Sequence, residues 1–277
     1  MVWHSEIVAT PDPPSPGVHN PIHDASGADA AGYAGALVAG VRTYGWAAQT
    51  LVDGLGADWR HHGWVDITLR RPLFAEEKLN ITVRQTDTDY ALTCAVAEPL
   101  GAGSNGVSKV VMDGQAGLGD APWRAELSPP DVQSPQDTQP PLPGYTLETV
   151  PLQQPLSPLG AWVSSTVARN LVSQDLGITD PHYQGDGPIP IHPYFLAGRM
   201  APLTRHNFTY GPTIHVRSQI QHLREGSSDR QVVVGAWIVD AYERKGHWYQ
   251  VLDGVVSDED GVLALIRHHT IFRPRQA

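Results

Sequence analysis

The sequence has few of the features by which several protein classes are recognised. It contains one cysteine, Cys94, among 277 residues, so no disulfide framework can form. Cys94 stands within an apolar stretch, which indicates a buried structural thiol. Lys and Arg number 19 against 29 Asp and Glu, and the formal net charge is −10. A chain this acidic lacks the clustered basic residues of a nucleic-acid-binding protein.

Long apolar runs and targeting signals are also absent from the sequence. No uninterrupted apolar run is long enough to span a bilayer. The first residues, MVWHSEIVAT, have neither the basic start nor the apolar centre of a signal peptide. We therefore expect a soluble, cytoplasmic protein in a reducing compartment, with neither nucleic acid nor a membrane as a partner.

Motifs for nucleotide, serine-nucleophile and metal chemistry are missing too. The sequence has no G-x-S-x-G elbow and no glycine-rich phosphate loop. It has 13 histidines, but the pairs His61-His62 and His268-His269 are adjacent. Adjacent residues on a strand point to opposite faces, so such pairs do not suit a metal ion. We expect neither a metal nor a cofactor.

The first half contains a long apolar helix followed by alternating segments. From Gly35 to Leu55 the apolar residues recur at helical spacing, and the remaining positions are mostly small, which is typical of a buried helix. Before it, Trp3 to Ala9 predicts a short strand and Asp24 to Ala31 a short helix. After it, four segments alternate apolar and polar residues and predict an antiparallel meander: residues 64–72, 78–86, 90–98 and 107–118.

The second half repeats this plan after a proline-rich stretch. Residues 125–158 combine proline with Gln, Ser and Asp, which predicts an extended linker between domains at 1–124 and 159–277. Gly160 to Leu176 predicts an amphipathic helix and His192 to His206 a second buried helix. Four strand-like segments close the chain: residues 213–223, 230–244, 247–258 and 263–275.

A short motif stands at the corresponding place in each half. GVHNPIH, Gly17 to His23, aligns with GITDPHY, Gly177 to Tyr183, so that Asn20 becomes Asp180 and His23 becomes Tyr183. A helix and four strand-like segments follow both motifs, as an internal repeat predicts.

The first motif resembles the hydratase element of MaoC-like, R-specific enoyl-CoA hydratases. That element reads roughly G-D-x-N-P-x-H, followed by a glycine-bearing apolar helix. Here Gly17, Asn20, Pro21, His23 and Gly40 match, whereas Val18 takes the place of the aspartate. The segment DITLRRPLFAEEKLNITV and the closing strands also resemble this family. The resemblance implies an α+β double hotdog, in which each half wraps a curved antiparallel sheet around a helix. The two sheets are expected to join edge to edge, which removes exposed edges.

The resemblance also implies roles for individual residues. His23 is the expected general acid or base, Asn20 orients the loop, and the Gly40 N–H stabilises the oxyanion of an acyl-thioester. Asp24 is placed among the catalytic residues, with a helix cap as its alternative role. We expect the remaining substrate-binding residues to be Val18, Tyr44, Asp186 and His192.

The loss of the family aspartate leaves the activity open. Val18 cannot take a proton, so either a neighbour substitutes or hydration is lost. The candidates are His19, Asp24, Asp180, Asp186 and His192. The expected function is hydration or dehydration of an enoyl or 3-hydroxyacyl group on CoA or a carrier protein. The alternatives are a cyclase or isomerase of a polyketide-like substrate, or a non-catalytic acyl-binding or assembly subunit. A homodimer is among the expected assemblies.

Overall fold

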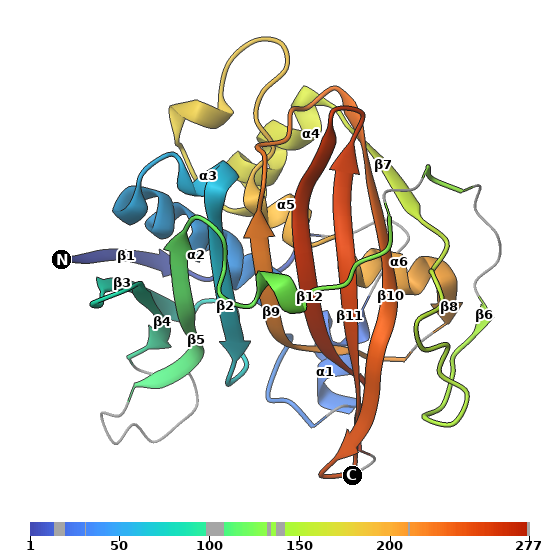
Figure 1. Cartoon of the computed structure of the whole chain (residues 1–277). Helices are drawn as coiled ribbons and strands as arrows, with labels where there is room; N and C mark the ends of the chain where they lie inside the picture. The colour runs from blue at the N-terminus through green and yellow to red at the C-terminus, as the bar shows by residue number, and fades with distance from the viewer. Residues whose placement is uncertain are drawn as a thin grey trace.

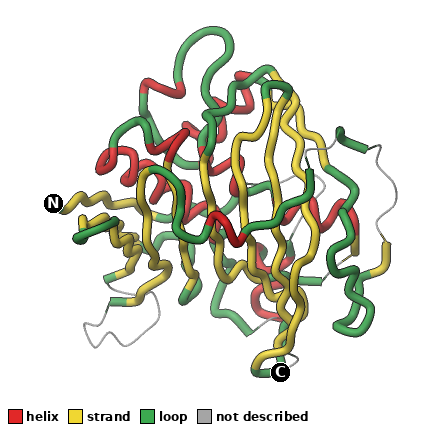
Figure 2. The backbone as a smooth tube through the Cα atoms, in the orientation of Figure 1, coloured by secondary structure: helices red, strands yellow, loops and turns green. Residues whose placement is uncertain are grey.

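Segments of alternating apolar and polar residues form one ten-stranded antiparallel sheet (Figures 1 and 2). The computed structural model describes residues 1–13, 20–30, 32–97, 108–131, 134–136, 142–209 and 211–275. Gly17, Val18 and His19 of the motif lie outside these ranges. In sheet order the strands are β1 (Val2–Val8), β3 (Lys78–Gln85), β4 (Tyr90–Val96), β5 (Lys109–Leu118), β2 (Gly63–Leu69), β9 (Ile214–His222), β12 (Gly261–Arg273), β11 (His247–Asp258), β10 (Arg230–Arg244) and β7 (Leu159–Val163).

The two halves meet in the middle of this sheet. β2 pairs with β9 from Trp64↔Gln221 to Thr68↔Arg217, so the two half-sheets are continuous. This confirms the expected edge-to-edge joining. A second, two-stranded parallel sheet pairs β6 (Leu142–Pro143) with β8 (Phe208–Thr209).

The helices gather mainly on one side of the large sheet (Figure 2). They are α1 (Ala25–Ala30), α2 (Gly40–Leu55), α3 (Trp59–His62), α4 (Ser165–Asn170), α5 (Pro193–Ala197) and α6 (Met200–Asn207), with the 3-10 helices η1 (Pro21–His23), η2 (Arg124–Glu126) and η4 (Pro181–Tyr183) and the π-helix η3 (Leu171–Asp175). No helix of the described residues is long and apolar enough to cross a membrane.

The core lies between α2 and the sheet. Tyr44, Ala47 and Leu51 on α2 are fully buried, as are Ile81 on β3 and Cys94 on β4. Burial alternates along β3 because every second side chain points to the helix. The short strand predicted at the N-terminus and the two four-strand runs are confirmed, and Cys94 is the buried thiol that the sequence indicates.

Three predicted helices are wrong in their extent. α2 begins at Gly40 rather than Gly35, because residues 37 and 38 are extended and the N–H of Val38 donates to Leu73 O. The predicted helix from Gly160 starts as strand β7, which pairs with β10, and becomes helical only at Ser165. The predicted helix from His192 to His206 is split into α5 and α6.

The described part of the proline-rich stretch packs against the second half rather than standing clear of it. η2 crosses the sheet face opposite the helices (Figure 1). Next to it, the N–H of Ser128 donates to Asp253 Oδ2 at 2.8 Å. Further on, Tyr145 and Leu156 are buried in the core. The domain boundaries at 124 and 159 remain a proposal.

Candidate active site

The loop that carries His23 is fixed to the second half by Asn20. The Asn20 side chain donates from Nδ2 to Thr213 O at 2.7 Å and accepts from the Thr213 N–H at 3.3 Å. Pro21 then opens η1, whose last residue is His23. A proline suits the first position of a helix because it has no N–H to leave unpaired. Asn20 therefore fixes the position of the His23 imidazole relative to the second half.

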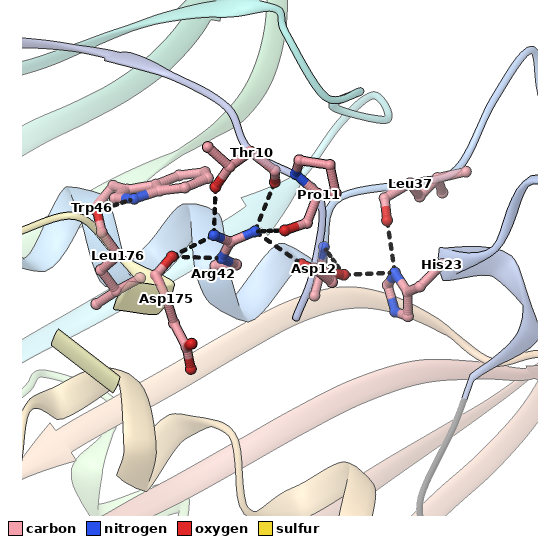
Figure 3. A network of polar contacts seen from close by, with 10 residues as sticks. Thr10, Pro11, Asp12, His23, Leu37, Arg42, Trp46, Asp175 and Leu176 are labelled. Carbon is pink, nitrogen blue, oxygen red and sulfur yellow. Dashed lines mark hydrogen bonds and ion pairs between the residues drawn. The ribbon is translucent and has the colours of Figure 1, made fainter. Parts of the chain in front are cut away.

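The orientation of the His23 ring follows from two oxygen acceptors. Its Nδ1 lies 2.7 Å from Leu37 O and 2.9 Å from Asp12 Oδ2 (Figure 3). Both partners are acceptors, so Nδ1 carries a proton in either charge state. The second nitrogen, Nε2, points away from them (Figure 3). In the neutral ring, Nε2 has the free lone pair and can accept a proton.

Asp12 is itself held by the start of α2. The N–H of Ala39 donates to Asp12 Oδ2 at 2.9 Å, and Arg42 Nη1 lies 3.4 Å from Oδ1. Arg42 is buried and also donates to the carbonyl oxygens of Thr10, Pro11 and Asp175 (Figure 3). One guanidinium therefore joins the N-terminal segment, α2 and the second half.

The charge of Asp12 controls the titration of His23. Burial alone would lower the pKa of His23, because it removes water from the imidazolium. The hydrogen bond and the negative charge of Asp12, with the hydrogen bond to Leu37 O, outweigh this, and the pKa of His23 is raised above its usual 6.5. The pair thus provides a base whose charged form is stabilised.

His23 lies between two pockets. The first, here called the small pocket, has a volume of about 230 Å³, and the second, the large pocket, about 510 Å³. His23, Asn20 and Ala39 line both. The small pocket is walled mostly by apolar side chains: Ile22, Leu37, Val38, Leu69, Leu73, Val111 and Ile214. The large pocket is more polar, with Asp12, Asp175, Arg199 and Arg205 among its lining residues.

Gly40 lies in the wall of the small pocket as the first residue of α2. The first N–H groups of a helix have no partner within it and carry the positive end of its dipole. The same residue is also tightly packed, because a Cβ there would lie 2.0 Å from Leu69 Cδ2 and 3.1 Å from His215 Nδ1. Close packing therefore favours glycine at this position, and its N–H remains available as a donor.

Another part of the wall of the small pocket comes from the second half. His215 on β9 and His268 on β12 line the small pocket, and their rings lie 4.4 Å apart between centroids. Ser218 Oγ connects them, at 2.8 Å from His215 Nε2 and 2.9 Å from His268 Nδ1. Burial lowers the pKa of His215 to about 4 and that of His268 well below its usual value, so both rings are neutral at neutral pH.

Three residues expected to bind substrate do not line either pocket. Tyr44 is fully buried, and its hydroxyl lies 2.8 Å from His222 Nε2. His192 caps α5, where its Nδ1 accepts from the N–H of Tyr194. Asp186 is exposed on the loop between η4 and α5. Asp24 does line the large pocket, beside His23 in sequence. Val18 and His19 fall outside the described residues.

In the second half, a side chain of the protein itself occupies the place next to the corresponding motif. Arg60 on α3 donates to Asp180 Oδ2 at 2.8 Å and to the Tyr183 hydroxyl at 3.1 Å. Tyr183 is fully buried and stands where the first motif has His23. Both motifs form a three-residue 3-10 helix, so the repeat is retained in shape while its polar groups pair with Arg60.

The sequence did not point to several residues of this site, namely Asp12, Arg42, Thr43, His215, His268 and Thr270. Asp12 lies among prolines outside the motif, and only the folded chain shows its distance to His23. For His268 a signal existed. In a strand that holds adjacent histidines, one of the two must face inward.

Comparison with known proteins gives a likeness in structure alone. No family model and no curated protein sequence matches the chain. A putative MaoC domain protein dehydratase from Chloroflexus aurantiacus superposes over 100% of this chain and 95% of its own, with a TM-score of 0.63 and 10% identity. A conserved hypothetical protein from Mycobacterium tuberculosis with a double hotdog fold covers 98% and 95%, with a TM-score of 0.61 and 12% identity.

A third solved structure extends the likeness to another kind of dehydratase. An isomerase-inactive variant of GphF DH1 covers 100% of this chain and 92% of its own, with a TM-score of 0.57 and 13% identity. These likenesses run over nearly the whole chain and include both halves. The chain therefore has the double hotdog fold, with the architecture that MaoC-like dehydratases share.

Proposed function

We propose that the protein hydrates or dehydrates an acyl group held as a thioester to CoA or a carrier protein. The observation that carries this proposal is the Asp12–His23 pair beside the N-terminus of α2 and the small pocket. Asp12 supplies the carboxylate that the motif lacks at Val18. The structural likeness to dehydratases supports the same reaction class.

His23 is the acid and base of the reaction. In the hydration direction, its Nε2 takes a proton from water while the water oxygen bonds to C3 of the enoyl group. The electrons of the C2–C3 double bond move toward the thioester oxygen. The imidazolium then returns the proton to C2, which completes the addition of water. Asp12 holds Nδ1–H throughout and stabilises the imidazolium, as an orienting carboxylate does in other acid–base sites.

Gly40 stabilises the charge that develops on the thioester oxygen. Its N–H needs no side chain for this role, and the helix dipole adds to it. The apolar walls of the small pocket strengthen the interaction because they exclude water. This division of work, with one imidazole and one backbone donor, needs no metal and no cofactor.

A hydration assay with crotonyl-CoA and a longer enoyl-CoA tests the proposal. We expect loss of enoyl absorbance with the wild-type protein, and a rate about 10²- to 10⁴-fold lower in His23→Ala, because that range is typical of a general acid–base group. His61→Ala is the control, since His61 is exposed on α3 away from both pockets.

Two outcomes would reject hydration as the reaction. One is a His23→Ala variant as active as the wild type. The other is a folded wild-type protein that binds acyl-CoA esters without hydrating them, which would favour a cyclase or an acyl-binding subunit.

A further inference from the structure

The small pocket contains two buried hydroxyl groups that no described residue satisfies. Thr43 Oγ1 and Thr270 Oγ1 form no hydrogen bond with the described part of the chain. Thr43 is 1% exposed and Thr270 is 7% exposed, and both line the small pocket. Folded proteins rarely leave buried hydroxyls unpaired, so each is expected to find a partner inside the pocket, either an ordered water or an oxygen of a bound ligand that displaces it.

His268 adds a third polar group to the same wall. His268 and Thr270 are two residues apart on β12 and therefore project to the same face of the sheet. Thr270 is paired in register with His215, and His268 with Ser218. The Nδ1 of His268 is engaged by Ser218, which leaves its Nε2 for the pocket that it lines.

The Ser218 hydroxyl allows this wall to act as donor or acceptor. Its O–H donates a hydrogen bond to one histidine, and its oxygen accepts a hydrogen bond from the N–H of the other. If Ser218 donates to His268 Nδ1, then His268 Nε2 carries the hydrogen. If Ser218 accepts from Nδ1–H, then Nε2 is an acceptor. His268 Nε2 can therefore meet either a hydroxyl or a keto oxygen.

These groups are distinct from those that the proposed reaction uses. The thioester oxygen is assigned to the Gly40 N–H and the oxygen at C3 to His23, so neither oxygen needs Thr43 or Thr270. An oxygen that meets Thr43 and Thr270 therefore belongs to another part of the acyl chain.

We propose that the small pocket recognises an oxygen atom, hydroxyl or keto, on the acyl chain beyond C3, through Thr43, Thr270 and His268. The inference rests on the proposed thioester function and names its substrate class as oxygen-bearing acyl thioesters. A plain alkyl chain would leave both threonine hydroxyls buried without a partner.

Calorimetric binding of two saturated esters, hexanoyl-CoA and 5-hydroxyhexanoyl-CoA, tests the inference without any reaction. We expect the hydroxylated ester to bind about tenfold more tightly, since one or two added hydrogen bonds have an effect of this size. Thr43→Val and Thr270→Val should each reduce the preference, and the double variant should abolish it. Thr270→Ser, which keeps the hydroxyl, should retain it.

Thr204→Val is the matched control. Thr204 is also a buried threonine, but its Oγ1 donates to Ala201 O and it does not line the small pocket. Its preference for the hydroxylated ester should equal that of the wild type. Thermal melting of every variant shows whether it is folded.

The outcomes separate this inference from the proposed function. Equal binding of the two esters would overturn the inference and leave thioester binding in place. A preference that survives in the folded Thr43→Val/Thr270→Val variant would also overturn it. Failure of both esters to bind would reject the thioester function and the inference together. Oxygen-dependent binding without hydration would keep the inference and reject only the hydratase reaction.

Discussion

At the residue scale, the proposed chemistry depends on Asp12. This carboxylate accepts from the N–H of Ala39 and lies 2.9 Å from His23 Nδ1. It therefore fixes the tautomer of the ring as well as raising its pKa. Arg42 holds the neighbouring backbone through the carbonyl oxygens of Thr10 and Pro11, so the segment stays in place when the carboxylate changes.

We predict that Asp12→Asn lowers the hydration rate by about 10²- to 10⁴-fold, the usual range for an acid–base group and its support. In the wild type, hydration needs neutral His23, so the rate falls as the pH drops below the raised pKa of His23. Without the charge of Asp12, burial lowers that pKa, and the acidic limb moves to lower pH. A pH–rate profile of both proteins measures the shift.

Asp186→Asn serves as the control for this prediction. Asp186 is exposed, and it lines neither pocket. Its rate and its pH profile should match those of the wild type. An Asp12→Asn variant with an unmoved acidic limb would show that Asp12 does not set the pKa of His23.

At the scale of the element, the first turn of α2 combines three tasks. Gly40 contributes to the wall of the small pocket, Arg42 anchors the N-terminal segment, and Thr43 lines the same pocket. Arg42 also donates to Asp175 O, so the helix start is tied to the second half. Residues on one turn of a helix point in different directions, which is how a single turn serves all three.

We predict that Gly40→Ala lowers the hydration rate more than its effect on folding explains. The new Cβ would meet Leu69 Cδ2, and moving that side chain should cost about 1–3 kcal/mol of unfolding free energy, as overpacking does. The methyl group also stands beside His215 Nδ1, in the space where the thioester oxygen would bind. Urea unfolding and initial rates measure the two effects separately.

Gly45→Ala is the matched variant on the same helix. Its Cβ would lie 2.9 Å from Leu176 Cδ2, a milder overpacking than at Gly40, and Gly45 does not line either pocket. We expect some loss of stability with little change in rate. A Gly40→Ala protein that keeps the wild-type rate would argue against the donor role of this N–H.

At the scale of the whole molecule, buried neutral histidines link stability to pH. Burial lowers the pKa of His192 to about 3, that of His222 to about 4, and that of His268 well below 6.5. The unfolded chain protonates these residues near pH 6.5. Below that pH, unfolding therefore takes up protons, and the free energy of unfolding falls as the pH falls.

We predict that the urea midpoint decreases steadily from about pH 7 to about pH 5, because each such histidine removes about 1.4 kcal/mol per pH unit from the free energy of unfolding. The contribution of His23 to the pH dependence of stability has the opposite sign. Its pKa is raised, so its contribution is present below pH 6.5 and is lost as the pH rises through the folded pKa. These three histidines, together with His215, whose pKa burial lowers to about 4, outweigh it.

The exposed His61 gives the control for the pH dependence. His61→Gln should leave the slope of stability against pH unchanged, since this side chain is 48% exposed. A midpoint that does not move between neutral and mildly acidic pH would contradict the prediction that the buried rings are neutral.

The sequence by itself determined the plan of the molecule. Alternation specified β2 to β5 and β9 to β12, because a strand that buries one face needs an apolar residue at every second position. Helical spacing located α2, although its start at Gly40 depends on the backbone of residues 37 and 38 pairing elsewhere. The motif located His23, Asn20 and Gly40, which the structure brings together at the small pocket.

Only the tertiary structure decided which groups complete the site. Asp12 lies within hydrogen-bond distance of His23 because Arg42 donates to carbonyl oxygens of the N-terminal segment and to Asp175 O in the other half. These bonds hold the N-terminal segment beside α2. His268 enters the pocket because β12 pairs with β9, and β9 is the strand that joins the first half through β2. Periodicity reports which face of an element is buried, but it does not say which distant residue will lie within hydrogen-bond distance. That is fixed only when the two halves pack.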